Sequence, residues 1–172
     1  MPDKKLIFSK DQIQQRVQEI GRQITKDYRD KKLIAIGILN GAFIFLADLV
    51  RNIDLPLEVD FVRVASYGEQ STSSGTITFT KDIELDLGGK DVLLVEDIVD
   101  TGRTIDYLKK YFKKHNPNSL RVCALIDKKE RRELDIELDY IGFEISEGFL
   151  VGYGLDYGEQ HRHYADIYHL IL

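Results

Sequence analysis

The sequence predicts an α/β fold built on a mainly parallel, twisted sheet with helices on both faces. Three observations lead to this prediction. Short, continuous apolar runs at 33–39, 92–97 and 120–127 are typical of strands that are buried on both faces. Segments with helical spacing alternate with these runs, as they do in βαβ units. No repeat or low-complexity linker divides the chain, so we expect one domain over residues 1–172.

The first predicted element is an amphipathic helix from about Asp11 to Asp30. Ser9 and Gln12 fit a capping box, in which each side chain accepts a hydrogen bond from the other residue's backbone N–H. Apolar residues then recur at spacings of three and four, which places them on one face of the helix. These residues are Ile13, Val17, Ile20, Ile24 and Tyr28. We expect this face to pack on the sheet.

The middle of the chain continues with strands and one further helix. Strand 33–39 leads into a segment with helical spacing at 41–52. Alternation of apolar and polar residues predicts strands at 57–66 and 76–82, which would add an antiparallel portion to the sheet. The residues between them, 67–76, are rich in Gly, Ser and Thr. They predict a long loop, and such loops within compact domains are often functional lids.

The C-terminal half repeats the strand and helix pattern. Strand 92–97 is followed by a predicted helix at 101–115, with Ile105, Leu108 and Phe112 on one face. Further strands are predicted at 120–127, 140–145, 149–156 and 168–172. In open sheets of this class, ligands bind beyond the carboxyl ends of the strands. Sites are therefore expected just after residues 39, 96, 127 and 155.

Composition and charge argue against several classes of protein. The formal net charge of −5 does not indicate a general nucleic-acid binder, which normally has a basic face. The one cysteine, Cys123, lies in an apolar run and predicts a buried side chain, as in proteins of a reducing compartment. The sequence shows neither a signal-peptide pattern nor the apolar run of about 18 residues that a membrane span needs. We expect a soluble, cytoplasmic protein with no membrane partner.

The most informative stretch is VLLVEDIVDTGRT, from Val92 to Thr104. Its apolar strand ends in Glu96 and Asp97, so both acids would project at the carboxyl edge of the sheet. Adjacent strand residues point to opposite faces. One carboxylate can therefore face a cleft directly while the other reaches it through water or a metal. Two such acids suit ribose hydroxyls or a divalent cation.

The second half of this stretch predicts an anion-binding bend between strand and helix. The start of a helix exposes unpaired backbone N–H groups and a partial positive charge. Hydroxyl side chains and a glycine that admits close backbone approach complete a cradle that suits phosphate. The bend contains Asp100, Thr101, Gly102 and Thr104. Acids at strand ends also occur in receiver domains and Walker-B strands, and Asp100 or Thr101 alone could be a helix N-cap.

As a whole, the stretch resembles the phosphoribosyl-pyrophosphate (PRPP) motif of type I phosphoribosyltransferases. The aspartate at position 100 resembles the branch that acts on 6-oxopurines, because adenine and orotate members usually have alanine there. The resemblance implies a small hood built from the N- and C-terminal segments and a mobile flap at about 66–80. It also implies that Asp100 is a general base and that Mg²⁺ is the cofactor. It assigns the ribose phosphate of PRPP to Glu96, Asp97, Asp100, Thr101, Gly102 and Thr104, and the metal to Glu96, Asp97 and Asp156.

GILNGAFIFLADL, residues 37–49, resembles the pyrophosphate loop of the same family. The resemblance implies a cis peptide between Leu39 and Asn40. Some relatives carry lysine where this chain has Asn40. Pyrophosphate would then be bound mainly by backbone N–H groups near Asn40 and Gly41, without a direct side-chain charge from this loop. A simple strand-to-helix turn is the alternative interpretation of this segment.

Two shorter matches concern the flap and the purine base. Ser66 and Tyr67 match the residue pair of the family's flap. Lys128, just after a strand, matches the residue that donates to O6 of the purine. An ammonium can only donate, so it favours a 6-oxo over a 6-amino group. A lone lysine here is otherwise a surface residue, and Arg131 and Arg132 beside it are interpreted as a solvated charged turn.

EGFLVGYGLDYGEQHRH, residues 147–163, is the last matching segment. Within the resemblance, Phe149 stacks on the purine and Leu150 offers backbone groups to its edge. Asp156 binds a second Mg²⁺, and Arg162 contacts pyrophosphate. Taken singly, Phe149 is more often a core residue, and Asp156 is equally consistent with a turn.

The resemblance extends from about residue 6 to 172 and implies an enzyme of purine salvage. It would transfer the 5-phosphoribosyl group from PRPP to hypoxanthine or guanine, giving IMP or GMP and pyrophosphate. A xanthine-preferring transferase and an RNA-binding transcription regulator of the same fold are the alternatives. Asp100, Lys128 and the negative net charge disfavour the regulator. The family's usual assemblies imply a homo-oligomer, either dimer or tetramer.

Overall fold

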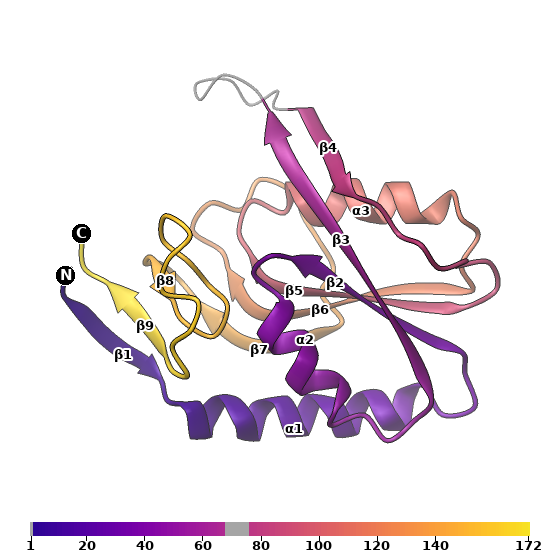
Figure 1. The fold of residues 1–172 in the computed structure, drawn as a ribbon, viewed down its shortest axis with the longest axis horizontal. Helices are drawn as coiled ribbons and strands as arrows, with labels where there is room; N and C mark the ends of the chain where they lie inside the picture. Colours follow the sequence, from indigo (N-terminus) through magenta and orange to yellow (C-terminus); the bar gives the residue numbers. More distant parts are fainter. Residues whose placement is uncertain (1, 68–75) are drawn as a thin grey trace.

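The computed structural model describes residues 2–67 and 76–172 (Figure 1). Within them, strands form a six-stranded sheet in the order β4-β3-β2-β5-β6-β7 and a three-stranded sheet in the order β1-β9-β8. The strands of the larger sheet are β2 (Leu33–Leu39), β3 (Leu57–Tyr67), β4 (Thr76–Lys81), β5 (Asp91–Val99), β6 (Ser119–Lys128) and β7 (Tyr140–Ile145). The smaller sheet contains β1 (Lys4–Phe8), β8 (Leu150–Val151) and β9 (Ile167–Leu170). The helices are α1 (Lys10–Asp27), α2 (Phe43–Val50) and α3 (Arg103–Lys113).

The larger sheet is parallel except at one edge. β3, β2, β5, β6 and β7 pair in parallel with their neighbours. β4 pairs antiparallel with β3, and Figure 1 shows this ribbon projecting beyond the sheet. The predicted α/β fold with a mainly parallel sheet is therefore confirmed, as is the antiparallel portion. Eight residues of the predicted flap, 68–75, lie outside the described part of the chain.

Helices cover both faces of the larger sheet, which explains its continuous apolar strands. Leu33 and Ala35 of β2 belong to the apolar core that α1 and α2 complete. Ile34, Ile36 and Ile38 of the same strand belong to the core that α3 completes. Because successive side chains point to opposite faces, both sets must be apolar. Figure 1 shows α1 and α2 on one side of the sheet and α3 on the other.

The capping box predicted at the first helix is present. The Gln12 backbone N–H donates to Ser9 Oγ at 3.2 Å, and the Ser9 N–H donates to Gln12 Oε1 at 2.8 Å. The helix starts at Lys10 and ends at Asp27, three residues before the predicted end. Asp30 has a left-handed backbone with φ of 62°, which does not continue a helix.

Three predicted boundaries around the site are wrong. β5 continues past Asp97 to Val99, because β6 runs alongside it and pairs as far as Asp127. α3 starts at Arg103 rather than residue 101, because Gly102 precedes it in a left-handed conformation with φ of 88°. The strand predicted at 149–156 is limited to β8, because Gly152 and Gly154 have φ values near 100° and turn the chain.

The small sheet brings the two ends of the chain together, as Figure 1 shows. β1 pairs antiparallel with β9, and β9 pairs antiparallel with β8. This sheet is the hood that the family resemblance implied, although the sequence pattern alone did not predict β1. Its sequence, KKLIF, is short and largely exposed, so it lacks clear alternation. Among the residues described, no helix has the length and apolar character needed to cross a bilayer.

The capping box gives a first test of how this fold is stabilised. Ser9→Ala removes the side-chain acceptor for the Gln12 N–H, and we expect a loss of about 1 kcal/mol in the free energy of unfolding. Gln15→Ala, an exposed change on the same helix, is the matched control. Urea unfolding measures both variants. Equal stability of the two would show that the capping box contributes nothing measurable.

Candidate active site

A small cavity lies where β5 turns into α3. Its volume is about 100 Å³. It is lined by Glu96, Ile98, Val99, Asp100, Thr101, Gly102, Thr104 and Ile105. A side chain at Gly102 would clash, because its Cβ would lie 2.9 Å from Ile136 Cγ1 and 3.2 Å from the Leu134 carbonyl oxygen. The glycine is thus required both by its left-handed backbone and by the closeness of the neighbouring chain.

The cavity has the features of an anion site. It lies at the N-terminus of α3, where helix geometry leaves backbone N–H groups directed outward with a partial positive charge. Thr101 Oγ1 accepts a hydrogen bond from the Arg103 N–H at 3.2 Å, so this hydroxyl already points into the bend. Asp100 Oδ1 is buried and has no hydrogen-bond partner in the described structure. A buried polar atom of this kind calls for a partner that the protein chain itself does not provide.

Glu96 and Asp97 lie within β5 rather than at its end. Glu96 is 7% exposed and lines the cavity, whereas the Asp97 carboxylate lies against Gly41. Burial, and then the charge of Asp97, raises the pKa of Glu96 well above its usual value near 4.5. Burial also raises the pKa of Asp97. Ionising both carboxyls in this strand is therefore unfavourable, and a cation beside them would favour their charged forms.

The predicted pyrophosphate loop packs against this acid pair. The Leu39–Asn40 peptide bond is cis, as the resemblance implied. A Cβ at Gly41 would overlap the Asp97 carboxylate, and a Cβ at Gly154 would overlap the Gly41 carbonyl oxygen. The loop is therefore held between β5 and the turn after β8 by two glycine contacts. Neither position has room for a side chain.

Arg162 lies on the same side of the sheet as this loop. Its Nη1 donates to the Gly154 carbonyl oxygen at 2.7 Å. It forms ion pairs with Asp156 at 3.4 Å and with Glu159 at 3.2 Å. Its positive charge also acts to lower the pKa of Asp97, although burial of that carboxyl outweighs this effect. The structure thus brings Arg162 and Asp156 close to the acid pair and the 39–41 loop.

The residues predicted to bind a base are grouped at the end of β6. Lys128 is 7% exposed, and its Nζ lies 3.5 Å from Glu130 Oε2. Glu130 also accepts a hydrogen bond from the Gly148 N–H at 3.4 Å, which joins Lys128 to the start of the 148–150 segment. Phe149 is 40% exposed, so it is not a core residue. Its ring meets Tyr157 edge to face, with centroids 5.3 Å apart.

Arg132 corrects the interpretation of the 131–132 pair as a solvated turn. Arg131 is exposed, but Arg132 is largely buried, with 19% of its side chain accessible. Its Nε donates to the Asp100 carbonyl oxygen at 2.9 Å, and its Nη2 donates to the Val99 carbonyl oxygen at 3.2 Å. A charge run in the sequence cannot distinguish these two neighbours, because the Val99 and Asp100 carbonyl oxygens that Arg132 contacts lie 33 and 32 residues away.

Other predicted residues are placed as follows. Leu150 is buried in β8, and Thr104 lies in the first turn of α3. Ser66 and Tyr67 end β3, where they pair with Ile77 and Thr76 of β4. Cys123 is buried, as predicted. Over residues 2–67 and 76–172, no group of three or more His, Cys, Asp or Glu side chains is arranged to hold a metal.

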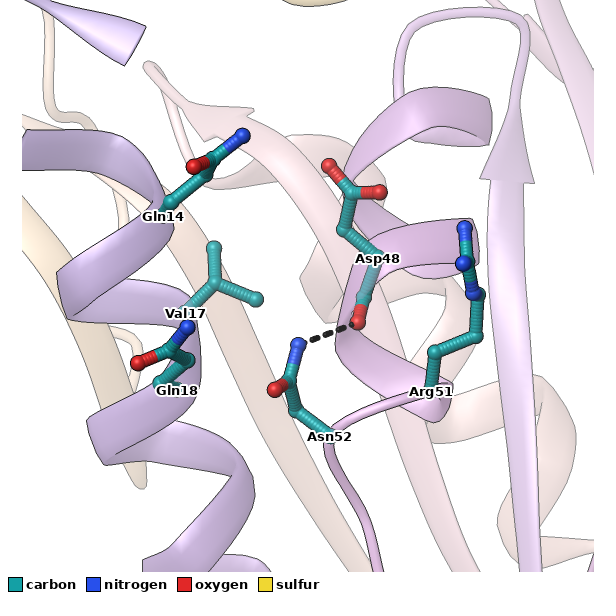
Figure 2. A pocket seen from close by; sticks show the side chains of 6 residues that line it. All are labelled: Gln14, Val17, Gln18, Asp48, Arg51 and Asn52. Atoms are coloured by element: carbon teal, nitrogen blue, oxygen red, sulfur yellow. Dashed lines mark hydrogen bonds between the residues drawn. The ribbon is translucent and has the colours of Figure 1, made fainter. Parts of the chain in front are cut away.

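A larger hollow between α1 and α2 is a different kind of site (Figure 2). Its volume is about 310 Å³, and the residues around it are Gln14, Val17, Gln18, Asp48, Arg51 and Asn52. Asn52 Nδ2 donates to the Asp48 carbonyl oxygen at 2.9 Å, as the dashed line in Figure 2 marks. Apart from Val17 the lining is polar, which is unlike the apolar walls that usually bind a planar base. None of the predicted site residues lines it.

An open α/β sheet with paired acids near the end of one strand, followed by a cavity at a helix start, fits the class of phosphoribosyltransferases. Residues 7–158 match the family model described as a phosphoribosyl transferase domain. The chain belongs to the type I phosphoribosyltransferase family, in its hypoxanthine-guanine branch. This confirms the resemblance that the PRPP motif indicated.

Relatives of known sequence and structure agree over nearly the whole chain. A hypoxanthine-guanine phosphoribosyltransferase of Aquifex aeolicus is 46% identical, covering 95% of this chain and 93% of the relative. A hypoxanthine phosphoribosyltransferase of Haemophilus influenzae is 41% identical, covering 97% and 95%. The crystal structure of a hypoxanthine-guanine phosphoribosyltransferase of Bacillus anthracis superposes with a TM-score of 0.94 at 38% identity. That match covers 99% of this chain and 100% of the other.

From the raised pKa of Glu96 we predict that this residue, when ionised, destabilises the fold. The folded-state pKa of Glu96 is raised, so its contribution to stability is lost as pH rises through that pKa. Gln at this position carries no charge. With divalent cations chelated, we expect Glu96→Gln to melt about 2–5 °C above wild type at about pH 8, with the gap closing toward about pH 5.

Asp60→Asn is the control, because the pKa of Asp60 is shifted in the opposite direction to that of Glu96. Burial acts to raise the pKa of Asp60, but hydrogen bonds from the Glu84 and Leu85 N–H groups outweigh it, and the pKa is lowered. Its ionised form therefore stabilises the fold, and that stability is lost as pH falls through the lowered pKa. We expect Asp60→Asn to melt below wild type at about pH 8. A Glu96→Gln variant that also melts below wild type would contradict the repulsion argument.

Proposed function

We propose that this chain transfers the 5-phosphoribosyl group from PRPP to hypoxanthine or guanine, giving IMP or GMP and pyrophosphate in purine salvage. Family membership and the near full-length similarity to hypoxanthine-guanine phosphoribosyltransferases support the proposal. The structural observation that carries it is Asp100. Its Oδ1 is buried and unpartnered in the wall of the cavity at the start of α3. A proton-accepting carboxylate thus adjoins an anion cradle.

The cavity at the β5–α3 bend would bind the 5′-phosphate. Thr101 and Thr104 offer hydroxyls, Gly102 admits the phosphate close to the backbone, and the helix start supplies N–H donors. Glu96 and Asp97 lie in β5, shortly before this bend, and would hold the ribose hydroxyls. The sugar phosphate would therefore lie along the end of β5, with its phosphate at α3.

The acid pair also fits Mg²⁺, the cofactor that this family implies. Two buried carboxylates with raised pKa values favour a nearby cation. Mg²⁺ usually binds one or two protein carboxylates and completes its octahedron with water and substrate phosphates, so no closed cluster of protein ligands is needed. Glu96 and Asp97 would hold one ion and Asp156 a second. When bound, the metal neutralises charge that develops on the departing pyrophosphate.

The 39–41 loop and Arg162 would bind pyrophosphate. Arg162 is oriented by its bond to the Gly154 carbonyl oxygen, so its guanidinium is held in place before substrate arrives. Asn40 stands where some relatives have lysine, and backbone N–H groups near Asn40 and Gly41 would bind in its place. Ser66 and Tyr67 would belong to the flap that excludes water during the reaction.

The purine would bind between β6 and the 148–150 segment. Lys128 would donate to O6, Phe149 would stack on the ring, and Leu150 would offer backbone groups to the base edge. Asp100 would accept the proton from N7 as N9 attacks C1 of the ribose and the bond to pyrophosphate breaks. Positioning and charge stabilisation supply most of the acceleration in such transfers.

The location, domain organisation and oligomeric state of the enzyme are also proposed. We place it in the cytoplasm, as one domain over residues 1–172, in a homo-oligomer of two or four chains. The family match over residues 7–158 supports the single domain, while the cytoplasmic location and the homo-oligomer rest on the usual behaviour of the family. Initial rates with hypoxanthine, guanine and xanthine, measured with PRPP and Mg²⁺, test the activity and rank the bases. Absence of nucleotide product with all three bases would refute the proposed function.

Asp100→Asn tests the general base. Removing the proton acceptor should lower kcat by about 10²- to 10⁴-fold, because general-base catalysis typically contributes that much. The dissociation constant of PRPP should stay within a few-fold of wild type, since the hydroxyls and N–H groups of the cradle remain. Asp106→Asn is the control and should leave kcat unchanged, because this half-buried side chain pairs with Lys110 on α3. A near wild-type kcat for Asp100→Asn would remove this residue from catalysis.

Lys128→Ala tests recognition of O6. Loss of one charged hydrogen bond costs about 1.5–3 kcal/mol, which corresponds to about 10- to 100-fold in the KM of the base. Hypoxanthine and guanine should be weakened alike because both carry O6, while the KM of PRPP stays unchanged. Lys129→Ala, whose side chain is 62% exposed, is the matched control. An unchanged KM for both bases would exclude Lys128 from the purine site.

A further inference from the structure

We infer that Arg132 is a positioning residue that sets the spacing between Asp100 and Lys128. The inference rests on the proposed function, because its purpose is to align the proposed proton acceptor with the proposed O6 donor. No step of that mechanism uses Arg132 directly. Its side chain is nevertheless largely buried, and its contacts lie beside both of those residues.

Arg132 lies where the β5–β6 ladder ends. The two strands pair as far as Val99 and Asp127, and the chains then separate. β5 continues into the bend of Asp100, and β6 ends at Lys128. Beyond this point the ladder supplies no further pairs to hold the two chains at a fixed distance.

The guanidinium of Arg132 replaces the missing ladder bonds. On the β5 side it donates to the carbonyl oxygens of Val99 at 3.2 Å and Asp100 at 2.9 Å. On the β6 side its Nη2 donates to Asp127 Oδ1 and more weakly, at 3.4 Å, to the Lys128 carbonyl oxygen. One planar group thus spans both strand ends. Its rigid fork fixes the angle between the bonds, which a lysine ammonium cannot do.

This spacing matters because of the shape of the substrate. N7, which carries the proton to be removed, and O6, which accepts a hydrogen bond, are neighbouring atoms on one edge of a 6-oxopurine. In the proposed mechanism Asp100 acts at N7 and Lys128 at O6, so the two side chains must match the fixed distance between these atoms. A misplacement of about 1 Å in such an arrangement can cost about 10²-fold in rate.

The phosphate cradle has a separate support. The backbone N–H groups of Glu133 and Leu134 donate to the Thr101 carbonyl oxygen at 3.0 and 3.2 Å. These bonds do not involve the Arg132 side chain. We therefore expect a change at Arg132 to affect the base-dependent step while the binding of PRPP is retained.

The choice of variant follows from Asp127. This carboxylate is 3% exposed and faces Arg132, so removal of the positive charge would leave it buried and poorly compensated. Arg132→Lys keeps the charge but loses the planar fork, and it is the principal variant. The paired change Arg132→Gln with Asp127→Asn removes both charges and serves if the lysine variant does not fold. Arg131→Lys is the matched control at an exposed neighbour.

Steady-state kinetics at a temperature well below each variant's Tm tests the inference. We expect Arg132→Lys to lower kcat by about 10- to 100-fold while the KM of PRPP stays within about twofold, and Arg131→Lys to match wild type. In an Asp100→Asn background the further loss caused by Arg132→Lys should be small, since the residue acts through Asp100. An unchanged kcat, or an equal loss in both backgrounds, would overturn the inference.

Amide hydrogen exchange separates this inference from the proposed function. Exchange over residues 97–104 should be faster in Arg132→Lys than in Arg131→Lys, whether or not the enzyme accepts a purine. If wild type forms no nucleotide, the proposed function fails and the exchange result still decides whether Arg132 holds the bend. Equal exchange in the two variants would show that Arg132 does not position it.

Discussion

The site depends on two like charges held next to each other in a buried strand. Glu96 and Asp97 lie in β5, which is paired on both sides and covered on both faces. Burial raises the pKa of both carboxyls, and the charge of Asp97 raises that of Glu96 further, so holding the pair in this strand lowers the stability of the fold. Only a partner with positive charge or donor groups relieves that loss. In the proposed function a metal ion and the ribose hydroxyls of PRPP would be such partners, so their binding would offset this loss of stability.

The remaining parts of the site are arranged by close backbone contacts around this strand. Gly41 approaches the Asp97 carboxylate, and Gly154 approaches the Gly41 carbonyl oxygen, so the region proposed to bind pyrophosphate is assembled from three segments distant in sequence. On the other side, Gly102 lets the bend pass against Leu134 and Ile136. Each contact excludes a side chain. The positions of the ligand groups are therefore set by packing of the main chain rather than by flexible side chains, which favours preorganised binding.

The sequence predicted the parts of this structure that depend on local patterns. The apolar runs predicted β2, β5 and β6, and the capping box predicted the start of α1, because both signals involve neighbouring residues. The motif from Glu96 to Thr104 likewise supplied most of the residues that line the cavity at the β5–α3 bend. Strand ends were less predictable. β5 runs on to Val99 because β6 extends beside it, and that pairing is a property of the sheet and not of either segment.

Arg132 shows the same limit within the site. Its sequence neighbours are charged, and by pattern it is indistinguishable from Arg131, yet one is exposed and the other joins two strand ends. The two arginines differ because Arg132 lies where the parallel pairing of β5 and β6 ends and the two chains separate. In the proposed function β5 turns to the phosphate and β6 to the base, so the divergence that would create a two-part site also removes the ladder bonds that would align its parts. A buried guanidinium, able to bind several carbonyl oxygens at fixed angles, restores that alignment at the point where the backbone no longer can.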